Sequence, residues 1–431
     1  MFKRIISSFF ALIMALLPFG KEAPQKCEAK FNGTFIQSWY CLWWDDERWQ
    51  QEVESMKKAD IEYLILQDTA SFTDADNATL SYPSELECFA ECEKYGDIIG
   101  DALRNCKGSG IKIFVGLADF EDWWTLAGLT SEYNKICDKM AQMVEEIYNK
   151  YYAGYEDTFY GWYFTPEINN VPTMKLSILN IAKGFNEIID TADRLNPDMP
   201  MLLSPYYTEH LSIPSVVAAL PEWQLFMQKA HLRDGDIFCP QDAVGAGWID
   251  LKDLDKVWKM YTSAVKSCDK DIKLWANCES MTVARDFVPL MPPKTLEDVN
   301  MTATLDRFVQ QMQVASKYVD NIITFSFNHY YCNDEVNPVY FETYLDYIKN
   351  GCTLETEKPS ATHRTSAENG VYTWEPASDN IGVAYYLIYR GRKAVARIEA
   401  TDELKFEADM KHEYSIVTVD GAGNKSDAII F

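Results

Sequence analysis

The strongest constraint on the fold of this chain is a regular alternation of short apolar runs with longer amphipathic segments. Eight such runs, each four to seven residues long, occur in the first 330 residues. Runs of this length separated by helical patterns are typical of parallel strands joined by crossover helices. The predicted strands are Gly33–Trp39, Ile61–Gln67, Ile111–Leu117, Phe159–Phe164, Met201–Tyr206, Asp236–Cys239, Ile272–Ala276 and Asn321–Phe327.

A helical pattern follows each predicted strand. Ile136, Met140, Met143 and Val144, for example, have the spacing of a buried helix face. The predicted helices are Asp46–Ala59, Leu86–Lys107, Ser131–Lys150, Met174–Leu195, Ile213–Ala230, Leu251–Cys268, Leu296–Val319 and Pro338–Asn350. Eight units over about 320 residues predict an α/β fold, a (β/α)8 barrel with long loops. A doubly wound open sheet is the alternative, but no Gly-x-Gly-x-x-Gly follows the first strand.

The character of the chain changes after Gly351. Residues 353–369 are polar and lack periodicity, and alternating strand patterns follow them. The segment around Trp374, Tyr414 and the turn DGAGNKS resembles a fibronectin type III domain, which implies a β-sandwich with the tryptophan in its core. We therefore expect a barrel over residues 27–352 and a small all-β domain over 353–431, serving as a spacer or a lid.

The N-terminus predicts export. Lys3 and Arg4 precede the apolar stretch Ile5–Leu17, which is too short to span a bilayer comfortably. Residues 1–26 are therefore interpreted as a signal peptide with a short N-terminal segment. The mature protein is expected in the periplasm, on the cell surface or secreted, without a membrane span.

Composition narrows the possible partners. The chain has 65 acidic and 40 basic side chains and a formal net charge of -25, which argues against nucleic acid. Aromatic residues make up 14%, which suits either a sugar-binding cleft or a large core. Eleven cysteines with no CxxC pair and only five histidines favour buried or paired thiols over a metal site. We expect no metal and no other cofactor.

Polar and aromatic side chains follow the predicted strands, where (β/α)8 enzymes have their active sites. Carboxylates, amides and aromatic rings are the mixture that sugars require, because rings stack on pyranose faces and polar groups bind hydroxyls. The candidates for catalysis are Glu167 after the fourth strand and Glu279 after the seventh. The candidates for binding sugar are Trp39, Trp43, Tyr206, Gln241, Asp242, Asn277 and His329.

The sequence GTFIQ followed by a tryptophan, the glutamate after strand four and the segment WANCE resemble a bacterial family of glycosidase-like barrels. The barrel also resembles the clan of retaining (β/α)8 glycosidases. That resemblance implies Glu167 as acid/base, Glu279 as nucleophile and carboxyls about 5–5.5 Å apart. Trp162, Trp275 and the opposing glutamate are expected to raise the pKa of the acid. The clan usually has Asn before the first glutamate, whereas this chain has Pro166, so Asn169 or Asn277 would have to bind the sugar 2-hydroxyl.

Each candidate also has a structural interpretation. Thr-Pro-Glu at 165–167 is a good helix start, in which Glu167 would serve the first turn. Glu279 could form a salt bridge at the rim, and Asp242 could be a turn residue before Gly245 and Gly247. The adjacent pairs Trp43–Trp44 and Trp123–Trp124 could pack loops. His329 could be a structural histidine.

The leading prediction is an exported glycoside hydrolase that acts on an oligo- or polysaccharide by a retaining, metal-independent mechanism. A non-catalytic glycan-binding protein on the same scaffold is the alternative from another class, and Pro166 favours it. A metal-dependent hydrolase or an esterase is disfavoured by the few histidines and by the lack of Gly-x-Ser-x-Gly.

Overall fold

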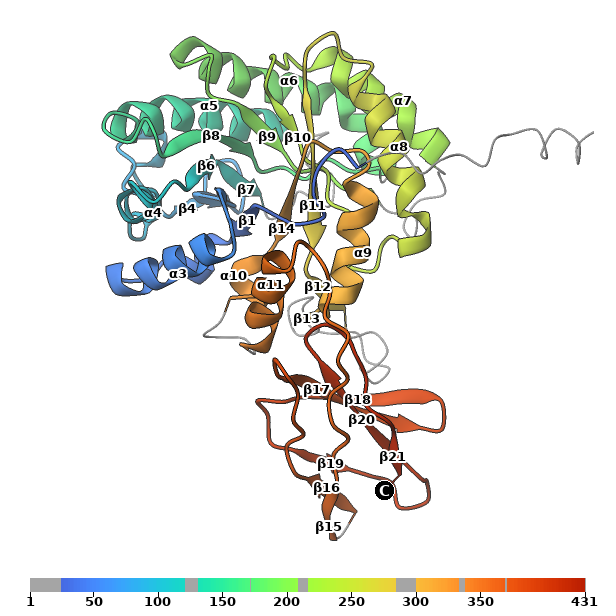
Figure 1. Cartoon of the computed structure of the whole chain (residues 1–431). Helices are drawn as coiled ribbons and strands as arrows, with labels where there is room; N and C mark the ends of the chain where they lie inside the picture. Colours follow the sequence, from blue (N-terminus) through green and yellow to red (C-terminus); the bar gives the residue numbers. More distant parts are fainter. Residues whose placement is uncertain are drawn as a thin grey trace, which may run out of the picture.

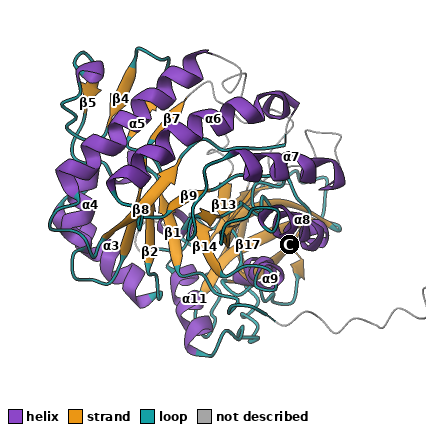
Figure 2. Cartoon of the chain, turned by 90° about the horizontal axis from the view of Figure 1, so that it is seen from above, coloured by secondary structure: helices purple, strands orange, loops and turns teal. Residues whose placement is uncertain are grey.

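Eight parallel strands close into a barrel in the order β1-β14-β11-β10-β9-β8-β6-β2. Figure 2 gives the view from above, with barrel strands in the middle and helices around them. The computed structural model describes residues 25–120, 131–170, 172–207, 216–283, 300–332, 338–368 and 370–430. The barrel strands are β1 (Gly33–Ile36), β2 (Tyr63–Leu66), β6 (Lys112–Gly116), β8 (Phe159–Phe164), β9 (Met201–Leu203), β10 (Ile237–Phe238), β11 (Lys273–Glu279) and β14 (Asn321–Phe325). Each strand falls on a predicted run, and the predicted closed parallel barrel is confirmed. Almost all of the predicted signal segment 1–26, and both Trp123 and Trp124, lie outside the described residues.

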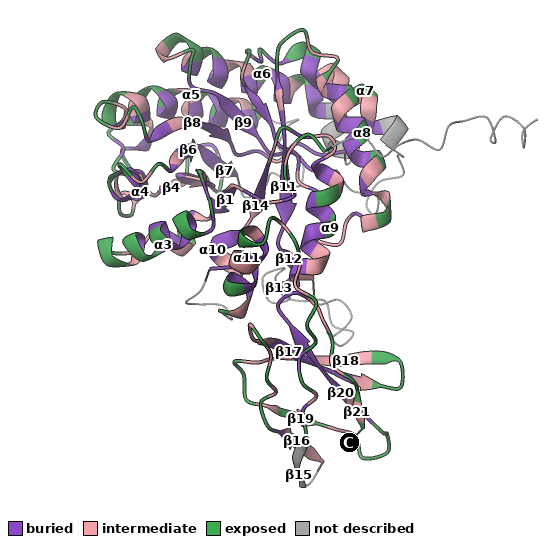
Figure 3. Ribbon diagram, in the orientation of Figure 1, coloured by how far each residue is buried: buried purple, intermediate pink, exposed green. Residues whose placement is uncertain are grey.

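Helices surround the barrel (Figure 1). They are α3 (Asp46–Lys58), α4 (Ile98–Cys106), α5 (Ser131–Tyr151), α6 (Pro172–Leu195), α7 (Val216–Lys229), α8 (Leu254–Val265), α9 (Leu305–Ala315) and α11 (Val339–Lys349), with short helices α2 (Ser38–Cys41) and α10 (Phe327–Tyr330) after β1 and β14. Trp162 points outward into the core shared with the helices, whereas its neighbour Tyr163 points into the barrel. This alternation follows from the pleat of the strand, and the strands are buried on both faces (Figure 3).

Two predicted helices are wrong in extent. The predicted helix Leu86–Lys107 contains a 3-10 turn (Glu87–Phe89), the strand β5 (Glu93–Lys94) and only then α4. The helix starts late because Asp97 caps it, with its Oδ1 accepting a hydrogen bond from the Gly100 N–H at 3.0 Å. β5 joins β3 (Ala70–Phe72), β4 (Ala78–Leu80) and β7 (Ala118–Phe120) in a small sheet that the sequence analysis missed. The predicted helix Leu296–Val319 begins only at Leu305, after the strand β13 (Asn300–Thr302), which pairs with β12 (Met281–Val283).

The residues after α11 form two antiparallel sheets, as the strand patterns predicted. One contains β15 (Arg364–Glu368), β16 (Val371–Trp374) and β19 (Lys405–Glu407). The other contains β17 (Val383–Arg390), β18 (Lys393–Glu399), β20 (Ser415–Asp420) and β21 (Ile429–Ile430). Trp374, Tyr386 and Tyr414 belong to the apolar core between them.

The turn after β20 docks on the barrel at the first turn of α9 (Figure 1). The backbone N–H groups of Leu305 and Asp306 donate to the carbonyl oxygens of Gly421 and Ala422, at 2.9 and 3.1 Å. The first N–H groups of a helix have no partner within the helix, so this turn satisfies two of them. A Cβ atom at Gly421 would lie 2.3 Å from Oγ1 of Thr343 in α11. The contact therefore requires glycine on steric grounds.

We expect Gly421→Ala to lower the free energy of unfolding by about 1–3 kcal/mol, because the new methyl group would clash with Thr343 where the turn contacts α11. Urea unfolding of the full chain measures this loss. Thr343→Ala in the same chain should restore part of it, because the nearest atom is then removed. If Gly421→Ala lowers the free energy of unfolding equally in the wild type and in Thr343→Ala, the steric explanation is contradicted.

Candidate active site

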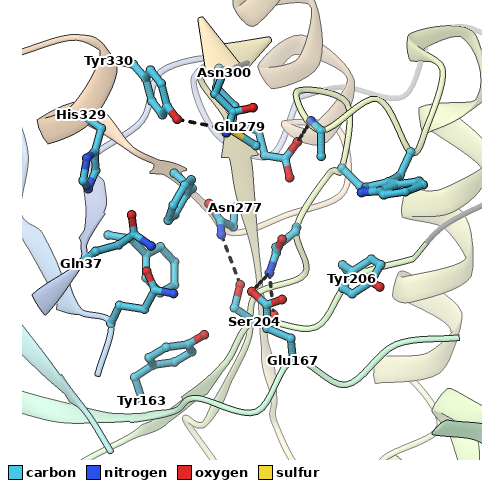
Figure 4. A pocket seen from close by; sticks show the side chains of 18 of the residues that line it. Gln37, Tyr163, Glu167, Ser204, Tyr206, Asn277, Glu279, Asn300, His329 and Tyr330 are labelled. Carbon is cyan, nitrogen blue, oxygen red and sulfur yellow. Dashed lines mark hydrogen bonds between the residues drawn. The ribbon is translucent and has the colours of Figure 1, made fainter. Parts of the chain in front are cut away.

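A cavity of about 630 Å3 opens at the carboxyl ends of the barrel strands (Figure 4). In parallel barrels the loops after the strands meet at this face, so residues distant in sequence converge there. Seven of the nine candidate site residues line the cavity, namely Trp39, Glu167, Tyr206, Gln241, Asn277, Glu279 and His329. Trp43 and Asp242 do not line it.

Glu279 is the last residue of β11 and points into the barrel, because Asn277 and Glu279 share the inward face of the pleat. Its side chain is 3% exposed, and its Oε2 accepts a hydrogen bond from the Ala246 N–H at 2.6 Å. A Cβ atom at Gly245 would lie 2.6 Å from Cβ of Glu279. Glycine therefore lets the loop after β10 approach the glutamate closely enough for its backbone to donate.

Glu167 lies three residues beyond β8, on the opposite side of the cavity from Glu279 in Figure 4. Its Oε1 accepts a hydrogen bond from Nε2 of Gln241 at 2.8 Å. The interpretation of residues 165–167 as a helix start is wrong, since α6 begins at Pro172. Thr165 instead donates its hydroxyl hydrogen bond to the Ala118 carbonyl. Glu167 therefore lies in a segment without regular secondary structure, next to a bend at Pro166, and lines the cavity.

Burial raises the pKa of Glu167 to about 7, and the nearby Asp119 adds to the increase, while the hydrogen bond from Gln241 opposes it. The expectation that Trp162 and Trp275 surround this carboxyl is wrong. Trp162 faces the outer helices, and Trp275 lies among the residues that fill the barrel interior. The strand pleat points Trp162 outward, and Trp275 faces inward but lies four residues before Glu279, deeper in the barrel than the rim.

Burial is also the main cause that raises the pKa of Glu279 to about 8, and Asp242 is the second cause. The Ala246 N–H and Arg307 act in the opposite direction, and the charge of Glu167 raises the pKa further. The charge of Glu167 therefore acts on Glu279 across the site, whereas Glu279 is not among the groups that shift the pKa of Glu167. Buried carboxyls with raised pKa values in a cavity are typical of acid–base catalysis.

Asp242 lies behind Glu279 rather than in the cavity, so the prediction that it contacts substrate is corrected. It is 1% exposed, and its Oδ1 accepts hydrogen bonds from the backbone N–H groups of Glu279 and Val244, at 3.3 and 3.2 Å. Its Oδ2 accepts a hydrogen bond from Nε2 of Gln311 at 2.5 Å, and that same nitrogen donates to the Glu279 carbonyl at 3.2 Å. The burial of Asp242 follows from the turn before Gly245, and its side chain holds the backbone of Glu279.

Amide side chains supply polar contacts inside the cavity. Asn277 donates from Nδ2 to the Ser204 hydroxyl at 3.2 Å, and its Oδ1 is buried without a hydrogen-bond partner among the described residues. The same holds for Oε1 of Gln67 and Oδ1 of Asn300, which also line the cavity. Buried acceptors without partners are costly in a folded protein unless a ligand satisfies them. Three unpaired oxygens therefore suit the hydroxyl groups of a sugar.

Asn169, the other proposed replacement for the missing asparagine, is 4% exposed and donates to the Glu167 backbone carbonyl at 3.1 Å. It supports the segment that carries Glu167, whereas Asn277 lines the cavity. Ser204, Asn300 and Trp248 also line the cavity and were not among the predicted site residues. Only Ser204 carried a signal, because it lies in a predicted strand.

Aromatic rings form one wall of the cavity. His329, in α10, lies with its ring 5.6 Å from that of Trp39 and 4.2 Å from that of Tyr40. Trp39 is 58% exposed, whereas Tyr206 is buried. Trp44 packs edge-on against Trp49 at 5.1 Å, so the packing interpretation holds for the second tryptophan of that pair. The wall therefore presents one open ring, that of Trp39, to the cavity mouth.

Among the described residues, no group of three or more His, Cys, Asp or Glu side chains is arranged to hold a metal ion. In the described part of the chain, no helix is long and apolar enough to cross a membrane. No disulfide bond joins any of the cysteines in the described part of the chain.

We expect Glu167→Gln to stabilise the fold at alkaline pH. The folded-state pKa of about 7 exceeds the ordinary value of 4.5, so ionisation of Glu167 opposes folding as pH rises from 4.5 through 7. Removing the charge should raise the free energy of unfolding by about 2–3 kcal/mol at pH 9 and by almost nothing at pH 4. Denaturant unfolding of both proteins at the two pH values checks this. An equal difference at pH 4 and pH 9 would contradict it.

Comparison with known proteins places the barrel among described folds. Residues 31–338 match the family described as a domain of unknown function (DUF4434). No protein of curated function matches the chain by sequence. A structure of a candidate alpha-L-fucosidase from Bacteroides thetaiotaomicron superposes with a TM-score of 0.60 at 20% identity, covering 77% of this chain and 99% of that one. This likeness shows the shared fold.

Two further solved structures match with lower scores. An endo-beta-1,4-mannanase from Thermotoga petrophila has a TM-score of 0.47 at 12% identity and covers 95% of this chain and 98% of its own. A psychrophilic family 10 endo-beta-1,4-xylanase has a TM-score of 0.40 at 14% identity and covers 69% of this chain and 86% of its own. The neighbours are thus described as glycoside hydrolases.

Proposed function

The chain belongs to the DUF4434 family, and we propose that it is a glycoside hydrolase whose catalytic residues are Glu167 and Glu279. One observation carries the proposal: two carboxyls with raised pKa values, from the ends of the fourth and seventh barrel strands, line one cavity, and the charge of Glu167 raises the pKa of Glu279. Amide oxygens without partners and an open tryptophan ring line the same cavity. The fold shared with a structure described as a candidate fucosidase is consistent with this function.

In the proposed mechanism Glu279 is the nucleophile and Glu167 the acid/base. The Glu279 carboxylate attacks the anomeric carbon while Glu167 gives its proton to the departing glycosidic oxygen, so that a glycosyl ester forms and the leaving alcohol departs. Glu167, now ionised, takes a proton from water, and the resulting hydroxide oxygen displaces Glu279 from the anomeric carbon. The product keeps the anomeric configuration of the substrate. This mechanism requires carboxyls about 5–5.5 Å apart.

The surroundings of the two glutamates act on their ionisation. Burial raises the pKa of Glu167, which favours the protonated form that a general acid needs. A backbone N–H group donates to Glu279, and Arg307 lowers its pKa, both of which favour the carboxylate form of a nucleophile. Burial and the charge of Asp242 raise the pKa of Glu279 and oppose that form. The proposed roles therefore require Glu279 to lose its proton before Glu167 does.

The test is the stereochemistry of the product. Proton NMR of the first product formed from an accepted glycoside should show the anomeric configuration of the substrate. A first product of the opposite configuration would show inversion and would make a second acid the base. If glycans bind but none in a broad panel is cleaved, the non-catalytic alternative is correct.

We further propose that the protein is exported and that residues 353–431 form a fibronectin type III-like domain. The basic start and apolar stretch of residues 3–17 support export to the periplasm, the cell surface or the medium. Trp374 and Tyr414 in one core between two antiparallel sheets support the domain assignment. Its contact with α9 favours a fixed support for the barrel over a freely moving spacer.

A further inference from the structure

Exposed aromatic rings gather beside the mouth of the cavity. Six large apolar side chains are exposed in the described part of the chain, namely Trp39, Trp43, Tyr95, Leu179, Met410 and Ile430. The first three belong to one region. Trp39 and Trp43 are four residues apart across α2 and its C-terminal cap, and the rings of Trp43 and Tyr95 lie edge to face with centroids 6.3 Å apart. We call Trp39, Trp43 and Tyr95 the aromatic row.

One end of the aromatic row lines the cavity, and the other end lies outside it. Trp39 lines the cavity, and Trp43 and Tyr95 lie outside the set of residues that do. Residues four apart on a helical turn lie on the same side. The exposed fractions are 58% for Trp39, 74% for Trp43 and 40% for Tyr95, so each ring keeps a face open to solvent. Exposed rings thus lie both at the proposed site of cleavage and beside the cavity that contains it.

The fold holds the outer end of the row in place. Tyr95 follows β5, and its N–H donates to the Leu80 carbonyl of β4 at 2.8 Å. Gly96 has a φ of 63°, and a Cβ atom there would lie 3.2 Å from Cδ1 of Leu42, so Leu42 packs against this turn. The Tyr95 hydroxyl donates to Glu93 at 2.5 Å. The small sheet beside the barrel therefore fixes Tyr95 next to Trp43.

We propose that the aromatic row is a binding site for the sugar units of a glycan chain that extends out of the cavity. This inference rests on the proposed function and deepens it, because it names the substrate as a chain of several sugars and not a single terminal unit. Flat aromatic faces next to polar groups suit pyranose rings, whose C–H faces are apolar. The continuity through Trp39 selects the occupant, since a chain held at Glu167 and Glu279 would pass over this ring when it leaves the cavity on this side.

The experiment measures how affinity depends on chain length, in a Glu279→Gln background so that nothing is cleaved. Isothermal calorimetry uses mannan, xylan and glucan oligosaccharides and a fucose-containing series, each from two to six units. We expect Trp43→Ala to weaken binding of the best six-unit ligand about 10-fold and of its two-unit form less than twofold. Trp43→Phe should keep most of the affinity, because a ring remains.

Met410→Ala is the matched control, because it truncates a side chain of similar exposure, 64%, in the turn between β19 and β20. Met410→Ala should change neither the affinity for the six-unit ligand nor the affinity for the two-unit ligand. Equal effects of Trp43→Ala on short and long ligands, or no effect on either, would overturn the proposal while leaving the proposed hydrolase intact. A change in oligomeric state on Trp43→Ala, seen by light scattering, would overturn it too and assign the row to self-association. Length-dependent binding by a wild type that cleaves no glycan would support the row and reject the hydrolase.

Discussion

Glu279→Gln should lower kcat/KM on any accepted glycoside by about 10^3- to 10^5-fold, because an amide cannot form the glycosyl ester on which the mechanism depends. The change preserves shape, and the new side-chain oxygen can still accept the hydrogen bond from the Ala246 N–H. Circular dichroism should therefore change little, and so should the unfolding midpoint at pH 4, where the carboxyl of Glu279 is protonated in the folded protein. Steady-state kinetics on the best substrate measures the loss.

Chemical rescue separates a lost nucleophile from a damaged site. In Glu279→Ala, added azide can enter the vacated space and attack the anomeric carbon, so a glycosyl azide of inverted configuration should form from an activated aryl glycoside. Glu146→Gln is the control, since Glu146 accepts hydrogen bonds from Tyr82 and Ser84 and lies outside the cavity. Activity within about twofold of wild type in Glu279→Gln would eliminate Glu279 as the nucleophile.

Glu167→Gln should act selectively. Turnover of substrates with poor leaving groups should fall by about 10^2- to 10^4-fold, because their oxygen needs the proton that Glu167 supplies. Activated aryl glycosides need little protonation, so their first step should be nearly unchanged, and the glycosyl ester should accumulate because no base activates water. A burst of aryl alcohol followed by a slow phase would report this.

The pH profile gives an independent check on Glu167. The acid is active only when protonated, so wild-type kcat/KM should fall as pH rises through about 7. In Glu167→Gln, with an activated substrate, that decline should disappear. Uniform losses on all substrates with an unchanged profile would assign Glu167 a structural role.

The barrel was predictable because the pattern of a short apolar run followed by a helical segment is local and occurs eight times. Each strand is a short apolar run, and within β11 the alternation of the pleat places Asn277 and Glu279 on one face. Knowing that the rim carries the site then made Glu167 and Glu279 candidates, and the resemblance to the retaining clan gave them their predicted roles. Neither step required knowledge of contacts between distant segments.

The surroundings of the two glutamates were not predictable, because they depend on where loops turn. Asp242 follows a strand as a cavity residue would, yet its side chain turns back to the Glu279 backbone. Gln311 is polar, so the apolar pattern of its helix does not predict that it is buried. It is nevertheless fully buried, where it hydrogen-bonds Asp242. The start of α4 depended on a cap at Asp97 inside an apparently continuous helical pattern.

The docking of the C-terminal strands has a consequence for how this protein can be divided. The turn at Gly421 and Ala422 receives the first hydrogen bonds of α9, and Gln311, on that same helix, holds Asp242 and the backbone of Glu279. A barrel cut away after α11 would keep every side chain of the cavity. It would also leave two helix donors without partners, one turn ahead of the residue that positions Glu279. The barrel and the C-terminal strands therefore form one unit. A domain exchange, in evolution or in engineering, would have to transfer both parts to keep the site intact.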